Sequence, residues 1–448
     1  MSTSQLFVAS FASLVAFGTL GLRGLPGLYT GDRLGWLDAF FTATSAVCVT
    51  GLTLVDTATA FTPLGQAFLL LLIQLGGLGM ITFTTLIILA LGGRPSLRQE
   101  RTFVGAPEVA PNVNRDRLIR EVLTFTLALE AFGALALYAL WAPRLGWVHA
   151  AWPALFHAVS AFCNAGFSTF SASLTDFQRS TLSLAVVMAL VVAGGLGFLT
   201  LTELRLWRTA RTLGRPFRLS LHSRLVLITT AVLIAVAWLV FAILEWDGVL
   251  RGLPAHGRLA NALFLAVTPR TAGFNTIDYA QAADSTNFLT VILMFIGGSP
   301  ASTAGGLKTT TVALLALFAF ARLRGSETPA AWSRSVPQET VQRAVGLSVA
   351  AFVLVTASIF ILTLSESTGG TPRGNDFLVY MFEAVSAFNT VGLSMAATPE
   401  LSSPGRVLIT LLMFVGRVGP ITFAASLTFA ARRHRHRFHY AYEDVVVG

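Results

Sequence analysis

The sequence is poor in charge. Only 12% of its 448 residues are Asp, Glu, Lys or Arg, and Lys308 is the only lysine. In contrast, 54% of the residues are hydrophobic and the mean hydropathy is +0.70. A soluble domain of this size does not need so much apolar sequence. The composition therefore predicts an integral membrane protein.

Cysteine and clustered histidine are also scarce. Cys48 and Cys163 are the only cysteines, which excludes a disulfide framework. The seven histidines are dispersed, without metal-ligand spacing, and no nucleophile constellation accompanies them. None of the expected membrane-crossing helices carries a run of arginines at every third position, as a voltage sensor would. We therefore expect no enzyme, no cofactor held by this chain and no nucleic-acid partner.

Four short glycine motifs recur along the chain. Their glycines are 115, 107 and 119 residues apart, and each follows a short apolar segment and precedes a long one. The fourth motif reads Thr-Val-Gly, the opening of the potassium-channel filter sequence. Backbone carbonyls replace the hydration shell of potassium in such filters. We call the four stretches the filter segments, and they comprise Val49, Thr50 and Gly51; Asn164, Ala165 and Gly166; Thr271, Ala272 and Gly273; and Thr390, Val391 and Gly392.

The apolar segments around these motifs follow one order, repeated four times. First helices are expected near 5–22, 118–141, 224–245 and 343–365; short segments near 37–48, 153–163, 258–269 and 376–388; closing helices near 64–91, 182–206, 286–320 and 406–430. A helix of about 11 residues is only ~17 Å long. It cannot cross a membrane core of ~30 Å, so the short segments are expected to be re-entrant.

This pattern predicts an all-α integral membrane protein with eight transmembrane helices. Four helix–pore-helix–helix repeats would surround one pseudo-fourfold pore, with repeats at 1–91, 92–206, 207–320 and 321–448, the last including a basic cytoplasmic tail. The links 92–120, 205–224 and 321–343 and the tail after Ala431 contain 6, 6, 4 and 4 arginines. The positive-inside rule places these links in the cytoplasm and the filter segments near the outer face.

The closing helices carry glycine clusters that predict breaks. The third closing helix, if continuous, would be about 52 Å long, far more than one crossing. We therefore expect an intramembrane loop at 297–306, built from small and polar residues. The candidate gate residues are Gly297, Gly298, Ser299, Pro300, Ser302, Thr303, Gly305, Gly306 and Lys308, together with Arg417 in the break of the fourth closing helix. Arg417 is the only arginine predicted at mid-membrane depth, where a cation usually faces a cavity or a partner.

Three of the motifs carry a family resemblance. The stretches Phe162–Phe167, Thr268–Asn275 and Ser386–Leu393 resemble the Trk/Ktr/HKT superfamily of potassium transporters, and the short N-terminus is most similar to its KtrB-like membrane subunits. The resemblance implies potassium uptake across the bacterial inner membrane, with sodium left open as an activator. It further implies that segment 297–306 blocks the cavity below the filter, with an arginine beside it at the position of Arg417. Some sodium-carrying plant members have serine where this chain has Gly51.

The resemblance also implies partners. It predicts a homodimer in the lipid bilayer and control by a cytosolic ring of KtrA-type RCK nucleotide-binding subunits. The basic tail 432–437 could meet that ring or anionic lipids, and the sequence does not separate the two.

A second function stays open at this stage, namely a proton- or sodium-coupled secondary cation transporter with alternating access. That class has inverted repeats and midplane carboxylates, whereas the repeats here run in parallel and midplane acids are scarce. For Glu130 we expect a hydrogen-bonded packing role. For Glu383 we expect a contribution to the outer mouth or support behind the filter, and for Arg270 a strut behind the filter.

Overall fold

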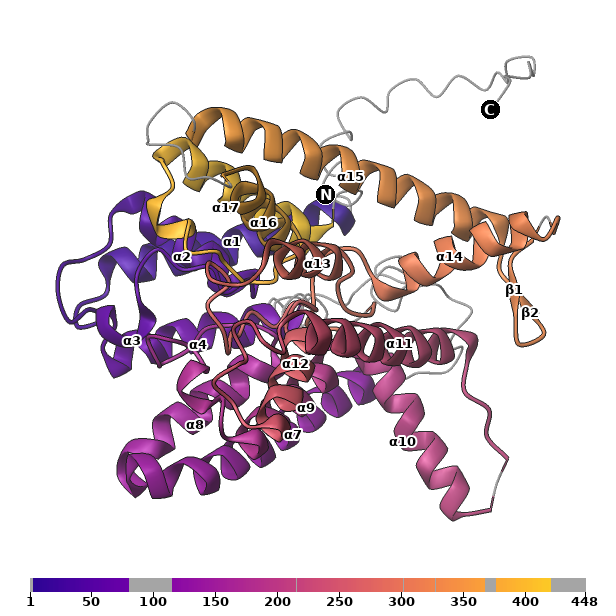
Figure 1. The fold of residues 1–448 in the computed structure, drawn as a ribbon, viewed down its shortest axis with the longest axis horizontal. Coiled ribbons are helices and arrows are strands. Elements are labelled where there is room, and N and C mark those ends of the chain that lie inside the picture. The colour runs from indigo at the N-terminus through magenta and orange to yellow at the C-terminus, as the bar shows by residue number, and fades with distance from the viewer. Residues whose placement is uncertain are drawn as a thin grey trace.

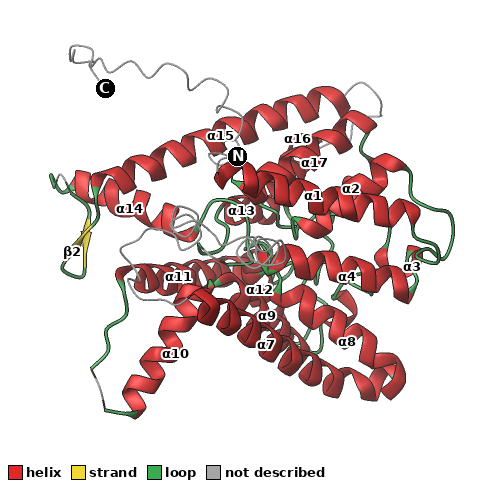
Figure 2. Cartoon of the chain, turned by 180° about the vertical axis from the view of Figure 1, so that it is seen from behind, coloured by secondary structure: helices red, strands yellow, loops and turns green. Residues whose placement is uncertain are grey.

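The computed structural model describes residues 3–79, 115–214, 216–300, 302–326, 328–366 and 376–419, and helices dominate it (Figures 1 and 2). Their order follows four successive sets. The first set contains α1 (Thr3–Gly24), α2 (Trp36–Val47), α3 (Thr57–Ala60) and α4 (Pro63–Gly77). The second contains α7 (Arg115–Leu145), α8 (Trp147–Phe162), η1 (Thr175–Phe177), α9 (Thr181–Gly195) and α10 (Phe198–Thr212).

The second half of the chain repeats this order. The third set contains α11 (Leu221–Leu244), α12 (Ala255–Val267), α13 (Asp284–Phe295) and α14 (Thr309–Leu323). A small hairpin of β1 (Ala330–Ala331) and β2 (Arg334–Ser335) follows, and it stands apart from the helices in Figure 1. The fourth set contains α15 (Gln338–Glu366), α16 (Asp376–Phe388), η2 (Thr398–Glu400) and α17 (Ser403–Val418).

Membrane-spanning character is clearest in three helices. Among the described residues, Val122–Leu145, Leu221–Leu244 and Gln338–Glu366 are long and apolar enough to cross a membrane. One side of α11 leaves apolar side chains 47% to 77% exposed, and these are Ile228, Val232, Val236, Leu239 and Ile243. Their spacing of three and four residues places them on one helix face, as expected for contact with lipid.

Helix starts follow local capping chemistry. Thr62 caps α4 by accepting a hydrogen bond from the Gly65 N–H at 3.2 Å, and Ser402 caps α17 through the Gly405 N–H at 3.3 Å. Such side-chain caps satisfy backbone donors that the first turn leaves free. Both helices thus begin at fixed positions, directly after the loops that follow the first and fourth filter segments.

Most helix bounds lie close to those expected, but α8 and α15 begin six and five residues earlier and α10 ends six residues later than expected. We expected the second short helix to begin at 153, but α8 begins at Trp147. Pro153 therefore lies inside the helix and not at its start. The carbonyl oxygen of Pro153 hydrogen-bonds to Nδ1 of His157 at 2.8 Å. A proline early in a helix therefore did not mark its first turn here.

The expected breaks in the second and third closing helices are present. Helices α9 and α10 meet at 103°, and Gly197 between them has φ of 81°. The segment from Ile296 to Lys308 separates α13 from α14. The expected continuations of the first closing helix to 91 and of the fourth to 430 lie outside the described residues.

Candidate functional site

The four filter glycines meet in a closed ring. A Cβ built on each glycine would lie against the carbonyl oxygen of the residue before the next glycine in the chain. The four contacts are Gly51 to Ala165 at 2.4 Å, Gly166 to Ala272 at 3.0 Å, Gly273 to Val391 at 2.5 Å and Gly392 to Thr50 at 2.0 Å. The last contact returns to the first segment. Glycine is therefore required by close backbone approach at every corner of the ring.

The backbone of each filter segment alternates in hand. The glycines have φ of 94°, 69°, 76° and 91°, and the residues two positions earlier are also positive, namely Val49 at 56°, Asn164 at 59°, Thr271 at 70° and Thr390 at 51°. The residues between them are not positive. In an ordinary strand successive peptides face opposite sides. This alternation departs from that pattern and lets successive carbonyls turn toward one side.

Hydroxyl side chains at the ends of the short helices hold the filter segments. Ser45 and Ser386 accept hydrogen bonds from the Gly51 and Gly392 N–H groups, both at 3.1 Å. Ser160 and Thr268 instead donate to the Phe167 and Phe274 carbonyls, at 2.8 and 2.5 Å. We did not select these four residues from the sequence, although a Ser or Thr five or six residues before each glycine was a readable signal.

The third filter segment is one residue tighter than the others. The N–H groups of Thr50, Ala165 and Val391 each bond the carbonyl five residues back at 2.8 Å, whereas the N–H of Ala272 bonds the Thr268 carbonyl, four residues back, at 3.0 Å. The ring is therefore only approximately fourfold.

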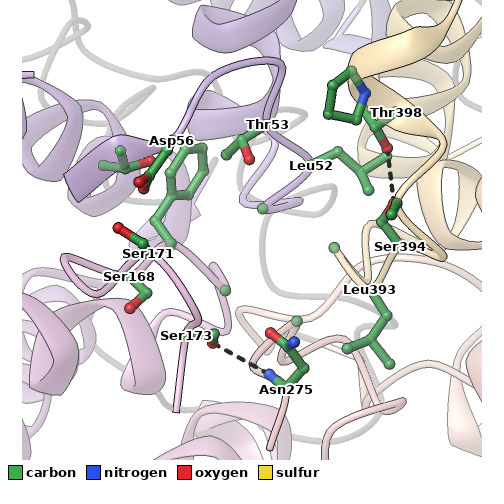
Figure 3. A pocket seen from close by; sticks show the side chains of 18 of the residues that line it. Leu52, Thr53, Asp56, Ser168, Ser171, Ser173, Asn275, Leu393, Ser394 and Thr398 are labelled. Atoms are coloured by element: carbon green, nitrogen blue, oxygen red, sulfur yellow. Dashed lines mark hydrogen bonds between the residues drawn. The ribbon is translucent and has the colours of Figure 1, made fainter. Parts of the chain in front are cut away.

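A cavity of about 360 Å³ lies on the side of the ring occupied by the residues that follow the glycines, and all four glycines line it. The side chains labelled in Figure 3 come from all four sets and surround this cavity. Two acids, Asp56 and Asp278, also line it. Asp56 accepts from the Ala58 N–H at 2.9 Å, and Asp278 accepts from the Ala280 N–H at 3.0 Å, so turn geometry fixes both carboxylates.

Two buried polar residues brace the loops that follow the second and fourth filter segments. Both His157 and Glu383 lie nine residues before their filter glycine. His157 Nε2 hydrogen-bonds to Ser168 Oγ at 2.9 Å. Glu383 accepts from Ser394 Oγ, from the Met395 N–H at 3.1 Å and from Thr398 Oγ1 at 2.6 Å. Glu383 thus holds the loop that follows the fourth filter segment, which is compatible with the expected support behind the filter.

The segment from Ile296 to Lys308 packs against the fourth filter segment and against the C-terminal end of α8. A Cβ on Gly305 would lie 2.1 Å from Thr390 Oγ1, and one on Gly306 would lie 2.4 Å from Asn389 Oδ1. On the other side Thr303 Oγ1 donates to the Phe162 carbonyl at 3.2 Å. The loop therefore lies between the fourth filter segment and the end of the short helix that precedes the second one.

Other hydrogen bonds stabilise the conformation of the loop and its contact with the second set of helices. The Gly297 N–H donates to the Leu307 carbonyl at 2.8 Å, and the Thr309 N–H donates to the Gly298 carbonyl at 3.0 Å. The Ser299 N–H donates to the Gly195 carbonyl at 3.0 Å, in the break of the second closing helix. Ser302 Oγ donates to the Ser299 carbonyl at 2.6 Å, and Pro300 beside it is half-buried.

Two cations contact this loop. Arg417 donates to the Thr303 carbonyl and, at 2.7 Å, to the Gly76 carbonyl, so it joins the loop to the first and fourth sets. Lys308 Nζ donates to the Ala304 carbonyl at 2.7 Å. Lys308 is therefore a strut within the loop, whereas Arg417 ties the loop to its surroundings.

The two other residues singled out from the sequence have packing contacts. Gln74 Nε2 donates to Glu130 Oε2 at 3.1 Å, which is the hydrogen-bonded packing role expected for Glu130. Arg270 is buried, and its Nη2 donates to Thr230 Oγ1 on α11 at 3.3 Å.

Oxygens without protein partners remain beside the ring. Among the described residues, the buried hydroxyls of Thr50, Thr271 and Thr390 have no hydrogen-bond partner in the protein. Hard cations prefer oxygen ligands. Carbonyls and hydroxyls at such close quarters could hold a dehydrated monovalent cation.

Comparison with known proteins gives a consistent relationship. Residues 4–434 match the family model TrkH, described as a cation transport protein. The chain is 37% identical to the potassium/sodium uptake protein NtpJ of Enterococcus hirae, over 100% of this chain and 98% of that protein. It is also 37% identical to the Ktr system potassium uptake protein B of Bacillus subtilis, over 99% of this chain and 96% of that protein.

The fold has a counterpart among solved structures. The crystal structure of the potassium transporter TrkH from Vibrio parahaemolyticus superimposes with a TM-score of 0.73, covering 97% of this chain and 86% of that chain. The sequence identity is 21%, so this likeness concerns the fold alone.

Proposed function

Because the chain belongs to the TrkH family of cation transport proteins, we propose that it takes up potassium through the ring of Gly51, Gly166, Gly273 and Gly392. The observation that carries the proposal is the closure of that ring in chain order. A single chain thereby supplies the four backbone segments that a filter needs around one axis. Potassium is the transported ion, and the carbonyls of the filter segments would hold it.

The proposed architecture is a multi-pass protein of a bacterial plasma membrane. Each set of helices would form one helix–pore-helix–helix repeat, with bounds 1–91, 92–206, 207–320 and 321–448 and eight membrane crossings. Helices α2, α8, α12 and α16 would be the pore helices, with their C-terminal, partly negative ends at the filter. The cavity with Asp56 and Asp278 would then be the outer entrance.

We assign gating to the loop 297–306 with Lys308 and Arg417. The loop lies against filter residues Asn389 and Thr390, in the space that an ion leaving the filter would enter. Small residues permit this close packing, since a Cβ on Gly305 or Gly306 would collide with the filter. Opening would require the loop to move away, and the contacts of Arg417 to Thr303 and Gly76 would resist that movement.

Regulation is proposed to come from other subunits. The relative from Bacillus subtilis is named as part of a Ktr system. We infer a homodimer that carries one pore in each protomer and is controlled by a cytosolic RCK-type nucleotide-binding ring. Whether sodium activates potassium uptake is tested in the flux experiment described next, with and without the ring subunit.

The deciding experiment measures ion flux in liposomes that contain the purified protein. Potassium and sodium are compared, with and without a ring subunit, and with no other gradient imposed. Passive potassium flux down its gradient is the expected result. Steady uphill accumulation coupled to a proton or sodium gradient would instead identify a secondary transporter with alternating access.

A further inference from the structure

Helix α10 (Phe198–Thr212) follows the apolar helix α9 and precedes the spanning helix α11. It leaves α9 at 103°, so its axis crosses the direction of α9 instead of continuing it. The spanning helix α11 begins directly after Ser220, whose N–H donates to Glu203 Oε2 on α10 at 3.0 Å. In Figure 1, α10 runs steeply across the direction of α11. With α9 and α11 running across the membrane, this arrangement would put α10 at one border of the membrane, with its axis near the membrane plane.

In the C-terminal half of α10, exposed arginines and an exposed leucine lie on different sides of the helix. Arg205, Arg208 and Arg211 recur at every third position and are all exposed. Leu206, and Leu213 directly after the last residue of α10, are 49% and 62% exposed, and their spacing of seven places them on one side, away from the arginines. These two leucines are therefore exposed in the isolated chain, although the transfer of a leucine side chain from water to an apolar environment is favourable.

An aromatic side chain lies between the two sides. The Arg211 guanidinium lies 5.4 Å from the ring centroid of Trp207. Tryptophan is enriched at membrane–water interfaces, where its ring is partly in lipid and its N–H remains near water. Its place on α10 fits a helix lying at that depth.

We propose that α10 is an interfacial helix that binds anionic lipid headgroups. Leu206 and Leu213 enter the boundary of the acyl chains, and the three arginines contact lipid phosphates. Arginine suits this task because its planar guanidinium can bond two phosphate oxygens at once. A cytosolic protein could also cover the arginines and the leucines, but the position of α10 beside the start of the spanning helix α11 favours lipid.

The depth of the two sides can be measured by spin labelling in nanodiscs of phosphatidylcholine and phosphatidylglycerol. The native Cys48 and Cys163 are buried and would not react. Labels are introduced by Leu206→Cys and, as the matched position on the charged side, by Arg208→Cys. We expect the label at 206 to be more accessible to oxygen than to a water-soluble nickel chelate, and the label at 208 to show the reverse. Equal exposure of both labels to the nickel chelate would overturn the proposal. So would protection of position 206 that arises only when a cytosolic protein is added.

The lipid preference is tested on the unlabelled protein by native mass spectrometry. The triple variant R205Q/R208Q/R211Q should bind phosphatidylglycerol more weakly, by about fivefold for each arginine removed. The variant R205K/R208K/R211K keeps the charge and should retain most of the preference over phosphatidylcholine. A triple Gln variant with the parent's lipid preference would contradict the assignment. Both readouts are independent of transport, so they can fail while the proposed function stands.

Discussion

Gly392 and Thr50 lie at opposite ends of the sequence, yet a Cβ added to Gly392 would lie 2.0 Å from the carbonyl oxygen of Thr50. This contact joins the fourth filter segment to the first and closes the ring. It is also the shortest of the four glycine–carbonyl contacts at the corners of the ring. A side chain at a filter glycine is therefore least tolerated at Gly392, where the fourth filter segment meets the first.

Gly392→Ala should abolish most potassium uptake. The added Cβ collides with backbone, and the φ of 91° imposes strain of roughly 1–2 kcal/mol on a residue with a side chain. We expect uptake to fall by about tenfold or more, since a strain of about 1.4 kcal/mol in the conducting conformation corresponds to a factor of ten. Rubidium or potassium uptake into liposomes measures it. Gly31→Ala, where no atom lies within 4 Å of the new Cβ, is the control and should behave like the parent. Normal uptake by a folded Gly392→Ala protein would remove Gly392 from the ion path.

Gly51→Ser should weaken the preference for potassium over sodium. A Cβ at this position would lie 2.4 Å from the Ala165 carbonyl oxygen, so the first corner of the ring must shift and the spacing of its oxygens must change. The measurement compares initial rates of potassium and sodium uptake. Gly31→Ser controls for the added hydroxyl. An unchanged ratio in a folded protein would show that Gly51 does not shape the ion-binding positions.

Deletion of residues 301–305 should raise basal flux in the absence of any regulatory subunit. The deletion removes Gly305, which lies against Thr390, and Thr303, which bonds the Phe162 carbonyl; Ala301 lies outside the described residues. Without these contacts the space below the second and fourth filter segments opens. Leak through liposomes is the assay, with thermal unfolding as the test of folding. A folded deletion variant with the parent's low leak would argue against a gate in this segment.

Two substitutions separate the possible roles of Arg417. Arg417→Gln removes the charge and weakens both bonds to Thr303 and Gly76, so uptake should rise or lose its dependence on a regulatory subunit. Arg417→Lys keeps the charge but loses the fork that reaches two carbonyls at once. If charge sets the barrier, the Lys variant should resemble the parent, and if anchoring dominates, it should resemble the Gln variant. Parent-like flux and regulation in both folded variants would leave Arg417 without a gating role.

Glu383→Gln should loosen the loop after the fourth filter segment. The carboxylate accepts bonds from Ser394, Met395 and Thr398, whereas an amide presents an N–H₂ group to one or more of these donors. A buried donor left unsatisfied costs about 1–3 kcal/mol. We expect a lower unfolding temperature together with a reduced potassium preference. Glu339→Gln, on an exposed pair with Arg343, is the control and should change neither quantity. A stable Glu383→Gln protein with the parent's selectivity would show that this bracing is dispensable.

Much of this architecture could be predicted from the sequence, because it rests on local constraints. Hydrophobic length separates α11 and α15 from the shorter α12 and α16, and the glycine clusters mark the breaks at Gly197 and after Phe295. Helix geometry and the need to satisfy backbone groups in a membrane act within a few turns of chain. Glu130 was assigned a hydrogen-bonded packing role from its place in an apolar segment, and its contact with Gln74 agrees, whereas two roles stayed open for Glu383.

The sequence by itself determined that four glycine motifs lie in matched helical contexts, because spacing and hydropathy are properties of the chain. Only the tertiary structure decided that Gly392 meets Thr50, that Gly305 packs beneath Thr390 and that Arg417 reaches across to Thr303 and Gly76. These contacts join residues more than a hundred positions apart in three cases and depend on how whole helices pack. Local propensity holds no information on such distances. The third filter segment shows the same limit, since the sequence does not reveal the tighter hydrogen bond from the Ala272 N–H to the Thr268 carbonyl.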